Sequence, residues 1–309
     1  MIRSICLNPV IDRSYYIDSF VTGRRIGNLV PAVSPGGKGI NVAKVCRQCN
    51  VPVILYGFIA GANGSLIREY VEESGITARL FETEGNTRET INILDRVQNQ
   101  ETELVEEGPA VPSDQIRQFM QMLREDIMPD DIVICSGISI TGAPEDIYVK
   151  ISEICKEKQA KCFLDTNSVD KEILMKGSYF LYKPNHKEVC ELFGRDITCD
   201  VVQIAEMAGK LTKQCEFILV SLGEEGGILV GKNIRCHLKV PKVDVVSTIG
   251  SGDSSVSGFA MGLEQGMDII QCAKYAMGCG IYNSTQKGIA CVNKAAALSL
   301  MNRIEVVKL

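Results

Sequence analysis

The chain has 309 residues, of which 45% are hydrophobic, and its net charge is −5 from 33 basic and 38 acidic side chains. This length and composition suffice for a sizeable buried core. The acidic balance gives no electrostatic reason to expect nucleic acid or an acidic membrane as a partner. No apolar run approaches the ~20 residues of a spanning helix, and the opening segment does not resemble a signal peptide. With thirteen cysteines, expected as free thiols in a reducing compartment, these features predict a cytoplasmic protein.

Apolar runs alternate with amphipathic segments along the chain. In chain order, strands are expected over 2–7, 53–58, 131–135, 161–165, 179–183, 217–221 and 227–230, and helices over 113–127, 144–158 and 201–214. This rhythm predicts an α/β fold with a mostly parallel central sheet, covered by helices on both faces. Two segments break the rhythm, roughly 13–33 and 89–107, and the second contains the polar turn Gln98-Asn99-Gln100. We expect one domain over 1–309 in which these two segments form a small β lid.

The segment 245–255 combines an apolar run, a Gly-x-Gly turn and an acid at the start of a helix. Gly250 and Gly252 permit backbone conformations closed to other residues, so successive amides, with that of Ser251, can converge on an anion. Asp253 lies where the helix dipole favours its ionised form, and it can accept the proton of a hydroxyl that attacks phosphorus. A capping Asp after an ordinary glycine turn is the alternative interpretation.

A second glycine turn, 35–39, also leads into a helix. It is not a Walker A loop, because no hydroxyl residue follows Lys38. Neither glycine turn has the three glycines of a dinucleotide-binding fingerprint. Asn41, on the first turn of the helix, can bind a polyhydroxylated ligand together with the amides of Gly36 and Gly37, and a plain helix cap is the alternative.

Two other strand ends carry polar side chains. The apolar approach 178–183 leads to Asn185, and Glu188 follows three residues later. This spacing fits a capping box, and it also fits a carboxylate that orders water on Mg²⁺. The first strand ends at Asn-Pro, and Asp12 follows three residues later. Loop residues at strand ends are where open α/β sheets meet their ligands.

In this order the motifs resemble those of the ribokinase-like (PfkB) sugar kinases, in the branch of 1-phosphofructokinase, tagatose-6-phosphate kinase and the minor 6-phosphofructokinase. The resemblance covers nearly the whole chain, through 7–12, 35–43, 87–88, 183–188, 220–223 and 248–254. It implies a ribokinase-like fold with a β-sheet lid, and a homodimer that pairs through the lid. It also implies ATP- and Mg²⁺-dependent phosphorylation of tagatose 6-phosphate, fructose 1-phosphate or fructose 6-phosphate to the bisphosphate.

The resemblance also implies a role for each residue at a matching position. Asp253 matches the catalytic base, and Gly250, Ser251 and Gly252 match the anion hole for the γ-phosphate. The positions implied for the sugar phosphate are Asp12, Gly36, Gly37, Asn41 and Arg88, with Arg24 and Lys38 as further cations. The positions implied for the nucleotide are Lys183, Asn185, Ser221, Gly223, Gly226, Gly250, Gly252 and Asn283, and Glu188 is implied for the metal, through water.

The chain departs from the family pattern at three places. Glu89 follows Arg88 in the lid, and Thr90 stands where asparagine is usual. An acid beside the expected phosphate grip predicts a lower affinity for a dianion. The loop 136–142 lacks the usual proline, and 165–168 reads Asp-Thr-Asn-Ser where Asp-Thr-x-Gly is usual. These departures leave the choice among the three sugar phosphates open.

Three other functions are compatible with parts of this pattern. The first is a related kinase that acts on an unphosphorylated sugar or a nucleoside, in which Arg88 would be only a structural lid residue. The second is a non-catalytic sugar-phosphate sensor, which the intact Asp253 and its two flanking glycines argue against. The third is an oxidoreductase, which the missing Gly-x-Gly-x-x-Gly fingerprint disfavours.

Overall fold

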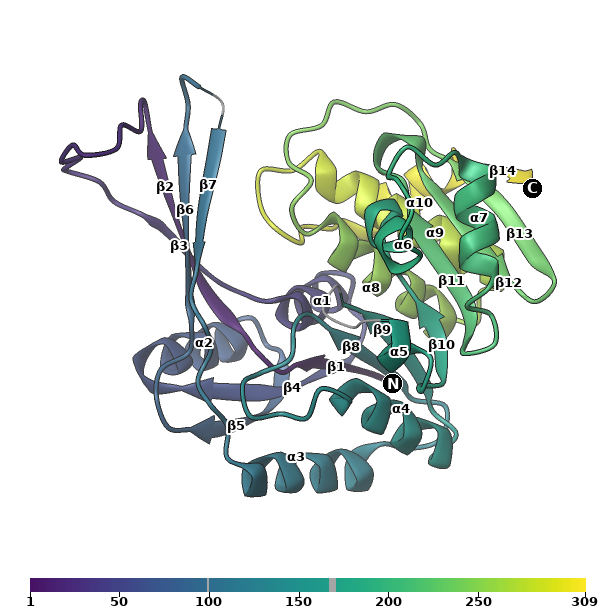
Figure 1. Ribbon diagram of the computed structural model, residues 1–309, viewed down its shortest axis with the longest axis horizontal. Helices are drawn as coiled ribbons and strands as arrows, with labels where there is room; N and C mark the ends of the chain where they lie inside the picture. The colour runs from purple at the N-terminus through teal and green to yellow at the C-terminus, as the bar shows by residue number, and fades with distance from the viewer. Residues whose placement is uncertain (99, 167–170) are drawn as a thin grey trace.

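The computed structural model describes residues 1–98, 100–166 and 171–309 (Figure 1). Ten strands form one large sheet in the order β14-β13-β12-β11-β10-β9-β8-β1-β4-β5. In that order the strands are Glu305–Lys308, Ile234–Lys239, Gly227–Gly231, Cys215–Ser221, Tyr179–Tyr182, Lys161–Asp165, Ile132–Ser136, Ile2–Cys6, Val53–Ala60 and Thr77–Thr83. Each of the seven predicted strands is present, and its ends fall within two residues of the expected ones.

The pairs from β11 to β5 are parallel, and β12, β13 and β14 extend the sheet by antiparallel pairing. The inner strands are continuous apolar runs; β8, for example, reads Ile-Val-Ile-Cys-Ser and is buried throughout. Such runs are typical of parallel strands that are covered on both faces. The predicted mixed sheet of mainly parallel strands is therefore confirmed.

Helices cover both faces of this sheet. One face packs against α1, α2, α8, α9 and α10, and the other against α3, α4, α6 and α7. In chain order these helices, with the short α5, are Lys38–Gln48, Gly61–Glu73, Ser113–Asp126, Ile147–Glu157, Lys171–Leu174, His186–Leu192, Val201–Gly209, Ser251–Glu264, Ile269–Ser284 and Lys294–Asn302. Helix α7 ends five residues earlier than predicted, because i→i−3 hydrogen bonds of Lys210 and Leu211 tighten the chain into the turn before β11.

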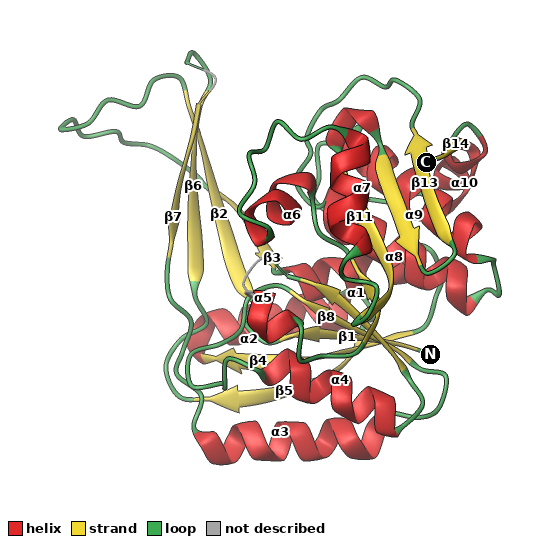
Figure 2. Cartoon of the chain, turned by 45° about the vertical axis from the view of Figure 1, so that its right-hand side comes forward, coloured by secondary structure: helices red, strands yellow, loops and turns green. Residues whose placement is uncertain are grey.

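Four strands form a separate small sheet in the order β3-β2-β6-β7. They are Ala32–Gly36, Val10–Ile17, Glu89–Asp95 and Gln100–Val105. Figures 1 and 2 show that this sheet projects from the body of the molecule near α1 and α2. The predicted polar turn at 98–100 includes Asn99, which lies outside the described residues. The two irregular segments of the sequence therefore form the small sheet because β2 and β6 pair in parallel with each other.

Two further properties concern the whole chain. No helix among the described residues is both long and apolar enough to cross a membrane. All thirteen cysteines are free thiols, and eleven of them are buried. Both members of the Cys-x-x-Cys pair at the end of α1, Cys46 and Cys49, lie in the core.

Candidate active site

Polar side chains gather where neighbouring parallel strands end. Ser136 closes β8 and Asp165 closes β9, and these two residues are paired in register. Lys183 follows β10 directly. Asn185 bridges to Ser221, which closes β11. Because the carboxyl ends of parallel strands meet at one edge of a sheet, these side chains share that edge.

Asp165 holds two lysines together at this edge. Its Oδ1 lies 3.3 Å from Nζ of Lys38 and 3.4 Å from Nζ of Lys183. The Asp165 side chain is 3% exposed and that of Lys183 is 5% exposed. Burial opposes the charge of Asp165, but Lys183 and Lys38 outweigh burial and lower its pKa. Burial also opposes the charge of Lys38, but Asp165, Asp253 and Glu188 raise its pKa. The cluster therefore places two lysines around one buried carboxylate.

The glycine turn at the start of α8 has the backbone geometry that the sequence predicts. Gly250 has φ 77°, and a Cβ there would lie 2.7 Å from the backbone nitrogen of Ala290, so only glycine fits. The N–H of Ser251 donates to Thr248 O within the turn. Among the described residues no carbonyl accepts from the N–H of Gly252 or Asp253. Within the predicted set only the amide of Ser251 is thus engaged in the turn, and the amide of Asp253 adds a further N–H without a carbonyl partner in the described part of the chain.

Asp253 lies beside Asn41, at the point where α1 meets α8. Nδ2 of Asn41 donates to Oδ2 of Asp253 at 2.7 Å, and Asp253 is 6% exposed. Burial raises the pKa of Asp253 to about 6, with Lys38 lowering it and Asp165 raising it further. The dipole of α8 was expected to favour the ionised form, but burial outweighs it because the carboxylate loses most of its water. Asp253 is thus poised to gain or lose a proton near neutral pH.

Asn185 and Glu188 form a complete capping box at the start of α6. The N–H of Glu188 donates to Asn185 Oδ1 at 2.9 Å, and the N–H of Asn185 donates to Glu188 Oε2 at 2.8 Å. The capping interpretation is confirmed, and it leaves Glu188 Oε1 for another partner. The negative charge of Glu188 also contributes to the raised pKa of Lys38, so the glutamate lies on the side of the charged cluster.

The residues present fit Mg²⁺ held mainly through water. Oδ2 of Asp165 is buried and has no hydrogen-bond partner among the described residues, and Glu188 keeps one free carboxylate oxygen. No group of three or more His, Cys, Asp or Glu side chains that could hold a metal occurs in the described part of the chain. Mg²⁺ requires few protein carboxylates, since it keeps several of its waters and substrate phosphates complete its coordination shell.

Asn283 holds the glycine turn from behind. Its Nδ2 donates to Ile249 O at 2.8 Å and lies 3.0 Å from Ser251 Oγ, while its Oδ1 accepts from the N–H of Cys291 at 2.9 Å. Asn283 is fully buried. Its amide is thus engaged within the protein, which indicates that it supports the turn instead of contacting a nucleotide base.

A second group of predicted residues meets at the base of the small sheet. A Cβ at Gly36 would lie 2.4 Å from Oδ2 of Asp12, so glycine lets the carboxylate lie against the backbone. Nη2 of Arg88 lies 3.5 Å from Asn8 O, and Nε of Arg88 is buried without a partner among the described residues. Burial raises the pKa of Asp12 to about 6, while Arg88 lowers it. Arg88 thus places an incompletely bonded cation beside a protonatable acid.

Glu89, which follows Arg88 in the sequence, pairs with a different arginine. Its carboxylate pairs with Arg13, through Nε at 2.6 Å and Nη2 at 3.0 Å, and accepts from Nδ2 of Asn63 at 2.9 Å. The pKa of Glu89 is lowered, chiefly by the hydrogen bond from Arg13. The pairing with Arg13 on the neighbouring strand offsets the charge of Glu89, and the lower affinity for a dianion stays a prediction.

Three of the predicted residues lie outside both the charged cluster and the group at the base of the small sheet. Arg24 is exposed in the loop between β2 and β3, which Figures 1 and 2 show at the outer end of the small sheet. Gly223 (φ 66°) begins η1 (Gly223–Glu225) and faces open space. A Cβ at Gly226 would lie 2.0 Å from Leu238 O. The last of these glycines is thus explained by backbone packing against β13.

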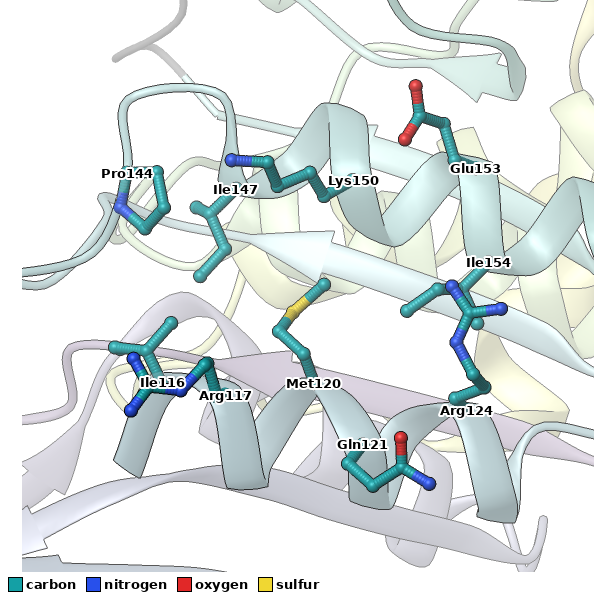
Figure 3. A pocket seen from close by; sticks show the side chains of 10 residues that line it. All are labelled: Ile116, Arg117, Met120, Gln121, Arg124, Pro144, Ile147, Lys150, Glu153 and Ile154. Carbon is teal, nitrogen blue, oxygen red and sulfur yellow. The ribbon is translucent and has the colours of Figure 1, made fainter. Parts of the chain in front are cut away.

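A hollow of about 380 Å³ lies elsewhere, between α3 and α4 (Figure 3). Apolar side chains such as Met120 and Ile147 line it, and none of its residues belongs to the groups above. Two of its cations already have partners, since Lys150 pairs with Asp146 and Arg124 with Glu157. We therefore assign no ligand to this hollow.

The described geometry agrees with what sequence comparison finds. The model of the pfkB family carbohydrate kinases matches residues 7–295. The chain belongs to the pfkB family of carbohydrate kinases. All of the residues described at the strand ends and at the base of the small sheet lie within the matched region.

Relatives of this pfkB kinase cover most or all of its length. A 1-phosphofructokinase of Bacillus subtilis is 32% identical over 269 residues, 86% of each chain. A tagatose-6-phosphate kinase of Staphylococcus epidermidis is 30% identical over 313 residues and covers 100% of both chains. Among solved structures, a putative phosphofructokinase from Staphylococcus aureus is similar over 100% of this chain and 99% of its own, with TM-score 0.83 and 27% identity. Phosphofructokinase-2 from Escherichia coli shares the fold, with TM-score 0.87 and 20% identity over 97% and 98% of the two chains.

Asp165 is the site residue that the motif comparison did not predict. The sequence carries a signal for it, because an acid ends the buried strand Lys161–Asp165 at the edge where ligands bind. Asn167 and Ser168, the last two residues of the segment 165–168, lie outside the described residues. The spacing of motifs cannot reveal that Asp165 joins two lysines that are 145 residues apart in sequence, from 183 minus 38.

Proposed function

We propose that this pfkB kinase transfers the γ-phosphate of ATP to a hydroxyl of a ketohexose phosphate, with Asp253 as the catalytic base. The observation that carries the proposal is the position of Asp253. It lies within hydrogen-bonding distance of Asn41, at the first turn of α8 and close to two lysines that Asp165 orients. A base with a pKa of about 6 is largely ionised at neutral pH and can still accept a proton in the transition state.

The nucleotide side of the proposal uses the start of α8 and the charged cluster. The amides of Gly252 and Asp253, at the positive end of α8, would bind phosphate oxygens. Nζ of Lys183 lies 3.4 Å from where a Cβ of Gly252 would be, so it can add a positive charge at the same place. Mg²⁺, when bound, neutralises phosphate charge, and Asp165 and Glu188 would hold it through water.

The sugar side of the proposal uses the base of the small sheet. Asp12, Asn41 and the backbone of Gly36 and Gly37 would bind hydroxyls, while Arg88 would bind the phosphate that the sugar already carries. In this arrangement the small sheet acts as a lid. Its closure over the sugar would exclude water, and so favour transfer to the sugar over hydrolysis of ATP.

The first test measures ADP release with fructose 1-phosphate, fructose 6-phosphate and tagatose 6-phosphate, with free hexoses and ribonucleosides as controls. We expect one phosphosugar to give clear turnover. Arg88→Ala should lower kcat/KM for that phosphosugar about a hundredfold, because a charge-assisted bidentate contact is lost. The affinity for ATP should stay unchanged, and Arg68→Ala, which removes a surface partner of Glu82, should behave as wild type. Turnover of free sugars only, or equal loss in both variants, would refute the assignment of Arg88.

We also propose a homodimer that pairs through the small sheet. On the sheet face away from Asp12, strand register places Val33, Arg13, Ile91 and Leu104 in one row. Val33 is 47% exposed and Leu104 is 53% exposed, which leaves apolar surface uncovered in the single chain.

A substitution that introduces a charge into this row tests the dimer. Leu104→Lys should shift the protein to a monomer in sedimentation velocity, because an unpaired cation in an apolar contact is costly. Val306→Lys, at the far edge of the large sheet, is the matched control and should leave the dimer intact. A wild-type monomer at micromolar concentration would contradict the proposal.

A further inference from the structure

A polar row extends along the small sheet beyond Asp12. Strand register pairs Ser14 with Asn92 and Asn92 with Glu103, so these three side chains lie side by side on one face of the sheet. Asp12 lies two residues before Ser14 and therefore on the same face, since side chains alternate along a strand. The Asp12 carboxylate on this face lies against Gly36, so the row begins at the base of the small sheet.

Glu103 is electrostatically coupled to both ends of the proposed sugar site. Burial is the main cause of the raised pKa of Asp12, and the negative charge of Glu103 raises it further. Burial lowers the pKa of Arg88, while Cys6, Asp12 and Glu103 act in the opposite direction. Cys6 itself is neutral, because burial raises the pKa of its thiol to about 11. Arg88 is therefore the cation, and Asp12 and Glu103 the acids, among the groups that these couplings connect.

The same row contains an unsatisfied polar group. Oδ1 of Asn92 is buried and has no hydrogen-bond partner among the described residues. An unpaired buried acceptor is destabilising, and a hydrogen bond from a ligand hydroxyl can relieve that cost. Asn92 lies between Ser14 and Glu103, so a hydroxyl that reaches it also comes within reach of the Glu103 carboxylate.

We infer that Glu103 is a specificity-determining residue, which accepts a hydrogen bond from a sugar hydroxyl beneath the small sheet and rejects substrates that carry an anionic group there. The inference rests on the proposed function, in which the sugar phosphate lies between Asp12 and Arg88. In that site the sugar phosphate can then bind in only one orientation. The phosphate must lie at the Arg88 end, and the part of the sugar beneath Glu103 must be uncharged, because two like charges close together repel.

The inference is tested by calorimetric binding of fructose 1-phosphate, fructose 6-phosphate, tagatose 6-phosphate and 6-phosphogluconate. The last ligand carries a phosphate and also a carboxylate. Wild type should bind 6-phosphogluconate at least about tenfold more weakly than the best ketohexose phosphate. Glu103→Gln should reduce the ratio of these two dissociation constants about tenfold, which corresponds to about 1.4 kcal/mol. Glu101→Gln is the matched control, because Glu101 lies on the same face of β7 two residues away and should leave the ratio unchanged.

A second readout separates charge from structure. In Glu103→Gln the pKa of Asp12 should fall, so the pH dependence of sugar-phosphate affinity should move to lower pH, whereas a merely structural residue would not move it. The Arg13–Glu89 ion pair does not involve Glu103, and thermal unfolding checks that each variant is folded. An unchanged ratio in Glu103→Gln, or the same change in Glu101→Gln, would overturn the inference. Absence of phosphosugar turnover with a shifted ratio would instead refute the kinase proposal and leave Glu103 as a determinant of binding.

Discussion

Replacing Asp253 with asparagine should lower kcat about a thousandfold, within the range that general base catalysis contributes. Asparagine keeps the size of the side chain and can still bond to Asn41, so the start of α8 should keep its shape. It cannot accept the proton of the attacking hydroxyl. The affinity for ATP should change less than about twofold, because the amides of Gly252 and residue 253 remain. Coupled ADP release and calorimetric ATP binding measure the two quantities.

The matched control for this variant is Asp268→Asn. Asp268 caps the start of α9, where its side chain accepts from the N–H of Gln271 at 2.9 Å, and Asp268→Asn should leave turnover unchanged. In wild type, kcat should fall as the pH drops through about 6, because Asp253 must be ionised to act as the base. Turnover that survives Asp253→Asn would contradict the assignment of the base.

Replacing Asp165 with asparagine should have two large effects. It removes the counterion of Lys38 and Lys183, and loss of one partner from a buried pair costs about 3 kcal/mol in the free energy of unfolding. The two lysines are then free to move, and misplaced phosphate ligands should lower kcat about a hundredfold. Chemical denaturation and ADP release test both expectations.

The pH dependence of the free energy of unfolding tests the contribution of Asp165 independently. The folded-state pKa of Asp165 lies below the ordinary value of 3.8, so its stabilising contribution is present above that value. The contribution is lost as the pH falls through the folded pKa. The difference in stability between wild type and Asp165→Asn should therefore shrink in strong acid.

Asp131→Asn is the matched control for the stability effect. Asp131 is 6% exposed and pairs with Arg3 at 2.6 Å, but it precedes β8 and so lies at the opposite edge of the large sheet. This variant should lose a similar amount of stability and keep its kcat. Equal loss of activity in both variants would show that Asp165 acts only through stability.

The alternation of apolar runs and amphipathic segments determined the α/β fold, because inner strands of a parallel sheet must be apolar on both faces. The glycine turns could also be predicted from the sequence. Gly250 needs a positive φ and has no room for a Cβ, and glycine is the residue type that meets both requirements. The motifs at these turns and at the capping box of Asn185 were enough to identify the family.

Tertiary structure alone decided which charges meet. The sequence placed Glu89 beside Arg88, yet Glu89 pairs with Arg13 because β2 and β6 are neighbours in the small sheet. It could not show that Asp165 joins Lys38 and Lys183, or that Glu103 shares a sheet face with Asp12. Local sequence determines backbone conformation and burial pattern, since these depend on each residue and its near neighbours. Pairing of charges depends on strand order and register, which long-range packing sets.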